Sequence, residues 1–566
     1  MKKILVALMI LALMLPVCAF AQTQSATAKG FGGDVVVTLS VDDGMITEVS
    51  IEGANETPEI GGIAMEQLPA KMMETNTVNV DIVAGATITS NAILAAAQDA
   101  LAAMGLDASA LKAVEVKAAD TTALEDVTAD VLVIGGGGAG MAAAVAAREE
   151  GKSVVLLEKL AMLGGNTAMS GGVFTRGAME GDPEGAMTKD ELYDYYMMMT
   201  GGKPDPEVVR TYVENSMDTQ QWAFNMGSGV QETAKFHTNP ANIMAIQAVG
   251  RGTLTNKMAE EVYETGVDVR LNTAATELIM ENGRVVGAVA TTADGRTQKF
   301  FGKGGVVLVT GGFPAEPTLL AKYSSKGAER AGLYCITGTT GDGIVMGEKV
   351  GAAIRFGEDW DSIGTSMPIE ASKPADLLPA LIVNDSGERF IDENGQLPHI
   401  YKEMLHQIAA GSDMFYYIFD ANTVGENPEQ HVANGVICAD TIEELAEKMG
   451  VPTETLVKTV ARYNEMTGKE DLDFGKKVEY LKGVTEAPFY AFKGWPYRTS
   501  TIGGLVIDKD ARVLDENGEP IPGLYSAGEV ANYSFFHTVY STCGSAVGHA
   551  ILFGRIAGTN AAQEVQ

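Results

Sequence analysis

The clearest hydrophobic pattern along the chain lies at residues 130–159. A continuous apolar run, Val131–Ile134, leads into a glycine cluster and an alanine-rich stretch, and a second apolar run covers residues 153–157. Short unbroken apolar runs are typical of strands buried on both faces of a parallel sheet, and the stretch between them has the length and composition of a helix. The pattern predicts a strand–helix–strand unit of an α/β domain.

The glycines of this unit point to a ligand. They read Gly135-x-Gly137-x-x-Gly140 directly after the first strand, and Glu158 closes the second strand. The first glycine permits a tight turn, the second lets the backbone approach a pyrophosphate, and the third packs the helix against the strand. The helix N-terminus offers free N–H groups to phosphates, and Glu158 is placed to accept hydrogen bonds from a ribose hydroxyl. We therefore expect a dinucleotide site here.

A second unit is expected nearer the N-terminus. Two apolar-rich runs, Val35–Val41 and Met45–Glu52, flank an Asp-Gly pair that favours a hairpin turn. An alanine-rich helix is predicted at Ala92–Met104. We expect residues 22–104 to form a small α+β domain, joined to the rest by a linker at residues 105–127 that is rich in Ala, Asp and Thr.

The first 21 residues have the pattern of a secretory signal peptide. Two lysines precede the apolar run Ile4–Leu15, which is too short to span a bilayer, and an Ala-Phe-Ala sequence ends at Ala21. Cleavage after Ala21 would leave a protein secreted beyond the cytoplasm. Cys18 keeps lipidation open as an alternative.

The dinucleotide is indicated by the small and hydroxyl residues that follow Glu158. Lys159–Gly172 reads KLAMLGGNTAMSGG, and further glycine-rich segments are GVVLVTGGF at Gly305–Phe313 and GLYSAGEV at Gly523–Val530. Over residues 128–566 the chain resembles the FAD-binding flavoproteins of the succinate dehydrogenase and fumarate reductase family. The resemblance implies non-covalent FAD in a Rossmann-like domain.

The resemblance also implies a division of this region. Residues 128–363 and 499–566 would form the FAD-binding domain, and residues 364–498 an inserted α+β cap domain over the substrate. A helix beginning near Ser545 would point its N-terminus at the flavin, where its dipole stabilises negative charge on the reduced ring. The residues assigned to FAD are Gly135, Gly137, Gly138, Ala139, Gly140, Glu158, Lys159, Gly164, Gly165, Asn166, Thr167, Ser170, Gly171, Gly172, Thr310, Gly311, Gly312, Asp342, Gly528, Glu529, Ser545, Ala546 and Val547.

The net charge and the cysteine content argue against several classes of partner and cofactor. The formal net charge of −33 argues against nucleic acid and anionic lipid. Beyond the signal peptide only Cys335, Cys438 and Cys543 occur, without the spacing of a haem, iron–sulfur or zinc site. Electrons are therefore expected to pass through flavins alone, and no metal is expected.

The N-terminal unit carries a motif of its own, Asp81-Ile-Val-Ala-Gly-Ala-Thr87-Ile-Thr89. It resembles the covalent FMN-binding domain of sodium-pumping quinone oxidoreductase subunits and urocanate reductase-like enzymes. In that family a flavin transferase esterifies FMN phosphate to a hydroxyl, which maps to Thr87, with Thr89 as the alternative; Asp81 would assist deprotonation. A plainer interpretation is a strand–turn–helix junction in which Thr89, Ser90 or Asn91 caps the helix.

The substrate site departs from the fumarate reductase pattern. Asn384–Glu393 matches the family's cap segment, but Leu397 stands where the proton-donating arginine is expected. Ser500 and Ser541 replace a histidine and an arginine of that family. Reduction of a dicarboxylate needs cations against both carboxylates. Fumarate and succinate are therefore poor substrate candidates.

A different relative is suggested near the C-terminus. Tyr540-Ser-Thr-Cys-Gly544 is similar to a segment of 3-ketosteroid dehydrogenases, in which a tyrosine hydroxyl and a glycine N–H polarise a ketone beside the flavin. The resemblance implies that Tyr540 and Gly544 form an oxyanion hole; the alternative is a core tyrosine before a helix. His537, Arg498, Tyr533, Tyr497 and His399 are further candidates for proton delivery or anion binding, whereas His549 is expected to be packed inside the helix.

The combined prediction is a secreted two-flavin oxidoreductase acting on CH–CH groups. A membrane donor, quinol or flavin-based, would reduce FMN on Thr87, and FAD would deliver hydride to an activated C=C bond of an enone or unsaturated monocarboxylate. Direct NADH use is not expected, because no second dinucleotide motif is evident. A desaturating dehydrogenase and a non-catalytic flavin electron carrier remain the alternatives.

Overall fold

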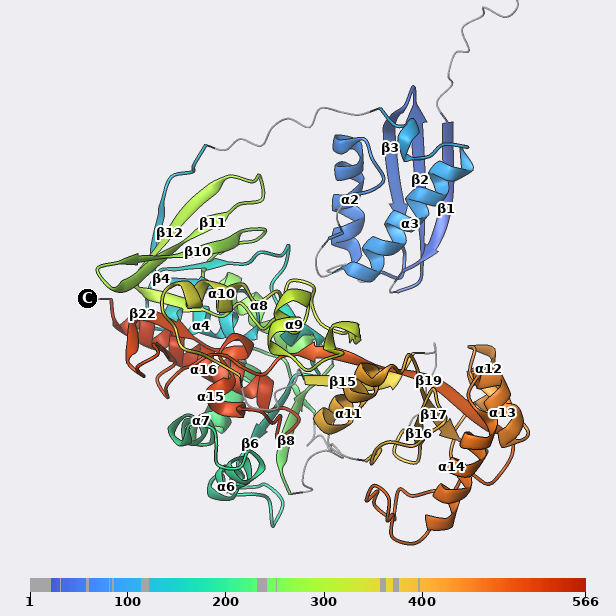
Figure 1. Cartoon of the computed structure of the whole chain (residues 1–566). Coiled ribbons are helices and arrows are strands. Elements are labelled where there is room, and N and C mark those ends of the chain that lie inside the picture. The colour runs from blue at the N-terminus through green and yellow to red at the C-terminus, as the bar shows by residue number, and fades with distance from the viewer. Residues whose placement is uncertain are drawn as a thin grey trace, which may run out of the picture. The chain divides into compact units, whose positions relative to one another are not determined.

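The computed structural model describes residues 22–30, 32–56, 61–80, 82–83, 86–112, 122–231, 242–250, 252–356, 363–369, 376–394 and 397–565 (Figure 1). The chain divides into two compact units, with the boundary after Asp120. The expected signal peptide, residues 1–21, and Asp81 lie outside the described residues.

The N-terminal unit is a three-stranded antiparallel sheet covered by two helices. Its elements are β1 (Gln22–Lys29), β2 (Asp34–Asp42), β3 (Met45–Glu52), α2 (Gly61–Thr75) and α3 (Thr87–Ala103). Val35, Val37 and Leu39 alternate along β2 and are fully buried in the same apolar core as residues of α2 and α3. The predicted hairpin is present, and β1 adds a third strand that the sequence pattern did not reveal.

Helix α3 begins five residues earlier than predicted, at Thr87. Its N-cap residue is Ala86, which makes no side-chain cap hydrogen bond. Thr89 and Ser90 lie inside the first turn and are buried, so the interpretation of Thr89, Ser90 or Asn91 as the cap is wrong. Thr87, the expected flavin acceptor, is thus the first residue of a helix.

The segment expected to be a linker is shorter than residues 105–127. Leu111 is buried in the N-terminal core, and the Lys112 N–H donates to the Gly44 carbonyl at 2.8 Å. At the other end, the Leu124 N–H donates to Thr297 in the second unit, and β4 begins at Val127. Both ends of the segment therefore belong to the folded units that they join.

The second unit is built on an eight-stranded sheet with the order β10-β11-β12-β4-β5-β9, in which β22 pairs with β12 and β21 with β22. β22, β12, β4, β5 and β9 are mutually parallel, whereas β10 and β11 form an antiparallel hairpin against the first half of β12. This mixed α/β sheet confirms the predicted fold class. The strands are β4 (Val127–Ile134), β5 (Val154–Leu157), β9 (Asp268–Arg270), β10 (Ala274–Glu281), β11 (Arg284–Thr291), β12 (Thr297–Leu308), β21 (Arg512–Leu514) and β22 (Pro520–Ser526).

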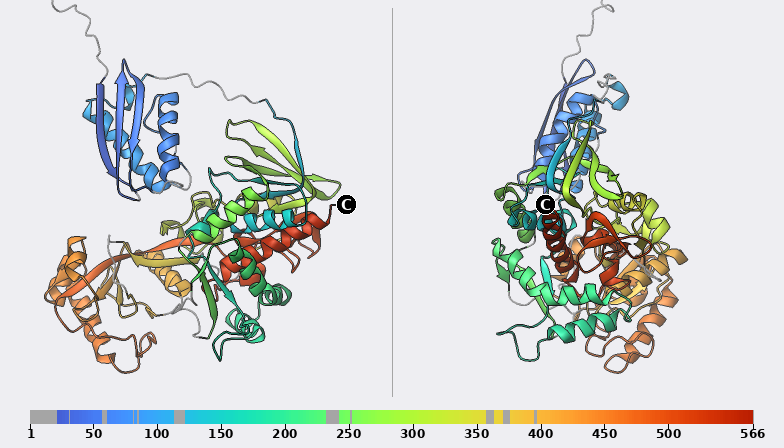
Figure 2. Two further views of the ribbon diagram at one scale, coloured as in Figure 1. Left: turned by 180° about the vertical axis from the view of Figure 1, so that it is seen from behind. Right: turned by 90° about the vertical axis from the view of Figure 1, so that its left-hand side faces the viewer.

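Two helices, α4 (Gly138–Glu149) and α16 (Ser545–Gln563), pack closely side by side (Figures 1 and 2). A Cβ added at Gly554 would lie 2.3 Å from the Ala139 carbonyl oxygen, and one at Gly558 would lie 2.1 Å from the Ala143 carbonyl oxygen. The glycines therefore let the two backbones touch.

The remaining elements of the FAD-binding part surround this sheet. They are α5 (Gly165–Met169), β6 (Val173–Arg176), α6 (Lys189–Met199), α7 (Pro206–Asn225), β7 (Val230–Gln231), β8 (Met244–Ala248), α8 (Thr253–Glu264), α9 (Pro317–Tyr323), β13 (Gly332–Leu333), α10 (Asp342–Lys349), β14 (Ile354–Arg355), β20 (Gly504–Leu505) and α15 (Tyr533–Phe536).

The cap is a second α+β layer around a long strand, β19 (Phe489–Ser500). This strand pairs with β13, β15, β17 and β18 and runs through residue 498, the expected boundary between cap and FAD-binding domain. Each face of the cap sheet packs into its own cluster of buried apolar side chains. The other cap elements are β15 (Ile363–Pro368), β16 (Leu381–Asn384), α11 (Leu397–Ala410), β17 (Phe415–Phe419), α12 (Pro428–Ala433), β18 (Ile437–Ala439), α13 (Ile442–Met449) and α14 (Thr453–Met466).

The predicted cap segment Asn384–Glu393 contributes to a buried charge cluster. Arg389 donates to both oxygens of Glu393 at 2.9 Å and to Asp471 at 2.7 and 3.2 Å, and Lys476 lies 3.5 Å from Glu393. All four side chains are at most 5% exposed. Burial alone would raise the pKa of Asp471, but the hydrogen bonds from Arg389 and from the Lys476 N–H hold it at about 2. The segment is therefore structural.

We expect Asp471→Asn to destabilise the cap by about 3 kcal/mol, because it leaves two buried cations, Arg389 and Lys476, against the single carboxylate of Glu393. Asp473→Asn is the matched control, since its ion pair with Arg462 is exposed to solvent and should contribute little to stability. Urea unfolding followed by cap tryptophan fluorescence measures both. Equal stability losses would contradict a buried-charge role for Asp471.

Candidate functional site

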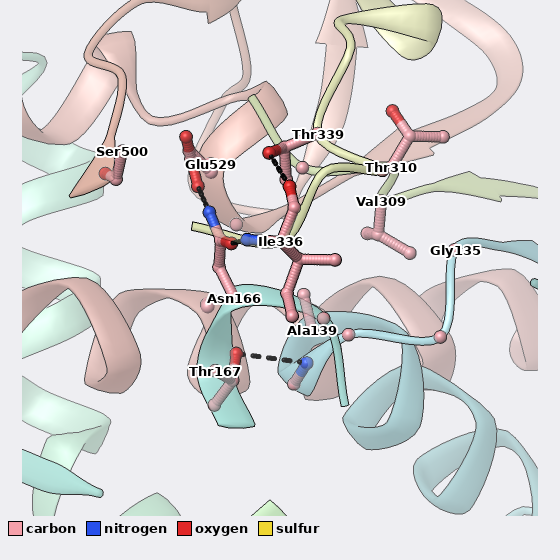
Figure 3. A pocket seen from close by; sticks show the side chains of 18 of the residues that line it. Gly135, Ala139, Asn166, Thr167, Val309, Thr310, Ile336, Thr339, Ser500 and Glu529 are labelled. Atoms are coloured by element: carbon pink, nitrogen blue, oxygen red, sulfur yellow. Dashed lines mark hydrogen bonds between the residues drawn. The ribbon is translucent and has the colours of Figure 1, made fainter. Parts of the chain in front are cut away.

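A cavity of about 380 Å³ opens at the carboxyl ends of β4, β5 and β12 (Figure 3). Ligands in open α/β sheets characteristically bind at this edge. Its walls come from the glycine loop after β4, from α5, from the loop before α10, from the end of β19 and from the first turn of α16. The cavity therefore gathers segments that are far apart in the sequence.

The three glycines of the loop have three different environments. Gly135 has a φ of +112°, and a Cβ there would lie 2.4 Å from the Val309 carbonyl oxygen. A Cβ at Gly140 would lie 1.8 Å from the Gly135 carbonyl oxygen. Around Gly137, by contrast, the nearest atoms that a Cβ would meet are 4.0 Å away. The open space at Gly137, at the N-terminus of α4, fits a phosphate of a dinucleotide.

Glu158 supports the glycine loop. Its carboxylate accepts hydrogen bonds from the Gly136 N–H at 2.7 Å and the Leu160 N–H at 2.8 Å, and its burial raises its pKa. Sequence reasoning assigned only a ribose contact to this residue. A carboxylate has about four acceptor positions, so the two backbone bonds leave capacity for the expected ribose hydroxyl.

Asn166 joins several walls of the cavity. Its amide donates to Glu529 at 3.2 Å and to the Thr499 carbonyl at 3.3 Å, and its side-chain oxygen accepts from the Ile336 N–H at 2.8 Å (Figure 3). In the same helix, Thr167 accepts from the Gly138 N–H at 3.2 Å. The polar residues of α5 therefore connect it to four other segments of the wall.

Glu529 lines the cavity from the segment that follows β22. Burial raises its pKa to about 7, although its carboxylate accepts from the Thr501 N–H at 2.7 Å and from Asn166. A Cβ at Gly312 would lie 2.1 Å from both Glu529 and Thr501 oxygens, which explains the glycine in the GGF segment. Glu529 is consequently a proton-exchanging group near neutral pH at the cavity wall.

On the β5 side, Lys159 bonds Asp342 at 2.7 Å and Thr340 at 2.6 Å, and Thr310 accepts from the Gly343 N–H at 3.0 Å. The predicted FAD residues that line the cavity are Gly135, Gly137, Gly138, Ala139, Glu158, Lys159, Gly165, Asn166, Thr167, Ser170, Thr310, Gly311, Asp342, Gly528, Glu529, Ala546 and Val547. The predicted FAD residues that do not line the cavity are Gly140, Gly164, Gly171, Gly172, Gly312 and Ser545.

Sequence reasoning missed one wall of the cavity, the loop that contains Tyr334, Ile336, Gly338 and Thr339. These residues precede α10, and the small Gly-Thr-Thr run before Gly341 was the only signal available. The Tyr334 N–H donates to the Arg498 carbonyl at 2.8 Å, which fixes this loop to β19.

At the start of α16, Tyr540 and Gly544 are not arranged as the predicted oxyanion hole. Gly544 is the N-cap residue, with a φ of +104°, and a Cβ there would lie 2.8 Å from Val173. Its N–H donates to the Tyr540 hydroxyl oxygen at 3.1 Å. The two groups are therefore bonded to each other, rather than both being directed at a ligand. The bond uses a lone pair of the hydroxyl oxygen, so the phenolic hydrogen of Tyr540, which lines the cavity, is still available as a donor.

The other candidates have distinct surroundings. His537 follows α15 in the left-handed region, with a φ of +54°, and stacks on Tyr533 at 5.0 Å between ring centroids. His399 is exposed on α11. His549 lines the cavity among aromatic rings, and burial lowers its pKa to about 3, so it is a neutral packed histidine as expected.

Arg498 lies near the end of β19 and is 8% exposed. Its Nε and Nη1 atoms are buried and have no hydrogen-bond partner among the residues that the structure describes. Tyr497, beside it, packs against Gly332 of β13, where a Cβ would lie 2.5 Å from the ring. Of the family positions that depart from fumarate reductases, Ser500 lines the cavity, Ser541 is buried, and Leu397 begins α11.

In the N-terminal unit, the hydroxyl of Thr89 is engaged within the protein. It donates to Glu56 at 2.5 Å, and Glu56 also accepts from the Gly32 N–H at 2.9 Å. Thr89 is 2% exposed. Because esterification needs an accessible hydroxyl, this environment disfavours Thr89 as the flavin acceptor; the side chain of Thr87 lies outside the described residues.

Among the residues that the structure describes, no helix combines the length and apolar character needed to cross a bilayer. The same residues contain no group of His, Cys, Asp and Glu side chains arranged to hold a metal ion.

Comparison with known proteins is consistent with both predicted domains. Residues 130–547 match the FAD binding domain family, and residues 30–102 match the FMN-binding domain family. A NADH:acrylate oxidoreductase of Vibrio harveyi is 31% identical over 96% of this chain, which spans 61% of that protein. A urocanate reductase of Eggerthella lenta is 31% identical over 96% of this chain and 92% of its own length.

The fold is also found in solved structures. A flavocytochrome c3 fumarate reductase in its open conformation superposes with a TM-score of 0.64 and 26% identity, over 78% of this chain and 79% of that one. The relatives are oxidoreductases that act on C=C bonds, in agreement with the predicted enzyme class. This chain belongs to the FAD binding domain family of flavoproteins and carries an FMN-binding domain at its N-terminal end.

Proposed function

We propose that this chain is a two-flavin reductase of an activated C=C bond in a small unsaturated substrate. The observation that carries the proposal is that one cavity is lined both by the phosphate-binding loop at Gly137 and by the Tyr540 phenol. FAD bound in this cavity would supply hydride to the β-carbon of the substrate. The same cavity therefore combines a cofactor site with a hydrogen-bond donor for a substrate carbonyl.

The chain's own residues would polarise that carbonyl. The Gly544 N–H donates to the Tyr540 oxygen, which strengthens the phenolic hydrogen as a donor. The N-terminus of α16, a helix of 19 residues, adds a positive dipole end beside Ala546 and Val547. Negative charge that develops on the carbonyl oxygen is thereby stabilised, and the α-carbon takes up one proton to complete the two-electron reduction.

FMN would be held covalently by Thr87, after attachment by a flavin transferase. Support comes from the FMN-binding domain at residues 30–102 and from the engagement of Thr89 with Glu56. A membrane-bound quinol or flavin-based donor would supply the electrons. We also propose that the protein acts outside the cytoplasm, on the basis of the signal-peptide pattern at residues 1–21.

The reverse reaction, desaturation of a saturated substrate, is the second candidate function. The similarity of Tyr540–Gly544 to 3-ketosteroid dehydrogenases favours a desaturase, in which the same groups would stabilise an enolate formed from a saturated ketone. Anaerobic oxidation of reduced viologen dye by a panel of enones, aryl acrylates and urocanate tests the reductase, and reduction of a dye by saturated ketones tests the desaturase. If the flavinylated protein turns over neither set, it is an electron carrier.

Fumarate is expected to be a poor acceptor in this assay. With serine at positions 500 and 541, the site lacks the histidine and the arginine that fumarate reductases place there, so at least one carboxylate of fumarate is left without a charge partner. The loss of one buried charge partner costs about 2 kcal/mol or more, so kcat/KM for fumarate should be at least about 30-fold below that of the best monocarboxylate or enone. Fumarate as the best acceptor would show that our alignment of the substrate site is wrong.

A further inference from the structure

Arg498 carries a buried guanidinium with donor atoms that the described protein does not engage. The side chain is 8% exposed, and its Nε and Nη1 atoms have no hydrogen-bond partner within the described ranges. A guanidinium stays protonated at every physiological pH. Burying such a charge without a partner is costly, so it is retained where a ligand supplies the missing anion.

The position of Arg498 connects it to the cavity. Thr499 and Ser500, the next two residues, line the cavity, and the Arg498 carbonyl accepts from the N–H of Tyr334, another lining residue. Strand β15 pairs Gly364 with Arg498 and Ile363 with Ser500, so Thr499 is an extra residue in the ladder. A bulge of this kind redirects side chains and is common beside active sites.

The thiol of Cys335 also indicates that the Arg498 guanidinium lies near the cavity wall. Cys335 lies between Tyr334 and Ile336, both of which line the cavity. Burial raises the pKa of this thiol to about 12, the charge of Glu529 adds to the rise, and the charge of Arg498 acts against it. The guanidinium is therefore close enough to Cys335 for its field to reach the loop that forms this wall.

The charged residues that line the cavity are otherwise engaged. Lys159 is paired with Asp342. Glu158 accepts from backbone N–H groups, and Glu529 accepts from Thr501 and Asn166. Arg498, whose neighbours Thr499 and Ser500 line the cavity, still has two buried donor atoms without a partner among the described residues. A guanidinium presents a planar fork of donors that matches one carboxylate.

We propose that Arg498 binds the carboxylate of the substrate, so that this chain selects unsaturated monocarboxylic acids over neutral enones and over dicarboxylates. The inference rests on the proposed reductase function and specifies its substrate class. A carboxylate activates a neighbouring C=C bond only weakly while it keeps its full charge. The guanidinium that selects the acid therefore also stabilises the additional negative charge of its reduction.

The test compares Arg498→Met, Arg498→Lys and the control Arg462→Met, whose arginine pairs with Asp473 on the cap surface. Cinnamate and its neutral analogue 4-phenylbut-3-en-2-one serve as acceptors for the holoprotein. We expect Arg498→Met to lower kcat/KM for cinnamate by about 100-fold and to change that for the ketone by less than about 3-fold. Arg498→Lys should recover part of the loss, and Arg462→Met should match the wild type.

A second measurement does not depend on turnover. The saturated acid 3-phenylpropanoate should raise the Tm of the oxidised wild-type holoprotein and leave that of Arg498→Met unchanged. Without ligand, Arg498→Met should have a Tm higher than the wild type by about 2 °C, since it removes an uncompensated buried charge. A purely structural arginine would give a lower Tm instead.

The outcomes separate this inference from the proposed function. If the wild type reduces the ketone but not cinnamate, or if Arg498→Met loses both activities equally, the carboxylate role is overturned while the reductase proposal stands. If the wild type reduces neither acceptor, nor any other alkene of the panel, the reductase proposal itself fails. A thermal shift by 3-phenylpropanoate that survives in Arg498→Met would place the anion site elsewhere.

Discussion

Thr87→Ala protein should carry its normal content of FAD and no covalently bound FMN. Thr87 completes the Gly-Ala-Thr motif and is the first residue of α3. Alanine removes the hydroxyl that would form the phosphoester and is a good helix former, so the helix should persist. Because the FAD cavity lies in the other unit, its cofactor content should not change.

Acid precipitation followed by mass spectrometry of the intact protein measures the covalent flavin directly. Thr87→Ser is the conservative control, because it restores a hydroxyl and should restore the adduct. Thr89→Ala should keep the adduct but weaken the N-terminal unit by about 1 kcal/mol, since it removes the hydrogen bond to Glu56. FMN at full stoichiometry on Thr87→Ala would move the attachment to Thr89 or end the covalent proposal.

Tyr540→Phe is expected to lower turnover of the true substrate by roughly 10²–10³-fold, which corresponds to about 3–4 kcal/mol of barrier. The substitution removes only the hydroxyl and keeps the ring, whose centroid lies 5.6 Å from that of the Phe536 ring. It also leaves the Gly544 N–H without the acceptor that it has in the wild type. Folding and FAD content should survive.

Steady-state kinetics with the dye assay and the FAD absorbance of the same samples measure these effects. Tyr416→Phe is the matched control, because Tyr416 is buried and donates to the Met449 carbonyl at 2.8 Å inside the cap. It should keep wild-type turnover. If Tyr540→Phe also does, the tyrosine is a packing residue, and His537 becomes the first candidate for the reacting groups.

The elements that the sequence predicted best are those with local causes. The strand–loop–helix around Gly135 and the hairpin of β2 and β3 follow from runs of a few residues, and both are present. The start of α3 was misplaced because three polar residues, Thr89–Asn91, fit a cap as well as they fit a first turn. Only the burial of Thr89 and Ser90 decides between these two readings.

The features that could not be predicted depend on partners far away in the sequence. Motif and spacing brought Glu158 and Tyr540 to attention, but not their hydrogen bonds to Gly136 and Gly544. That Nε and Nη1 of Arg498 have no hydrogen-bond partner among the described residues depends on all the segments packed around it. The loop at Tyr334 lines the cavity although its residues carry little chemical signal of their own.

The glycine-mediated contact between α4 and α16 has a consequence for biosynthesis. About 400 residues separate the two helices, and their N-termini line the same cavity. During synthesis, the strands and cap between them are made first, whereas the cavity can close only after Gly558 has been added. Contacts between segments this far apart in the sequence form slowly, so we expect closure of the cavity to be a late step of folding. FAD bound to the closed form would stabilise it by mass action, so we expect the yield of native protein to rise with the supply of flavin.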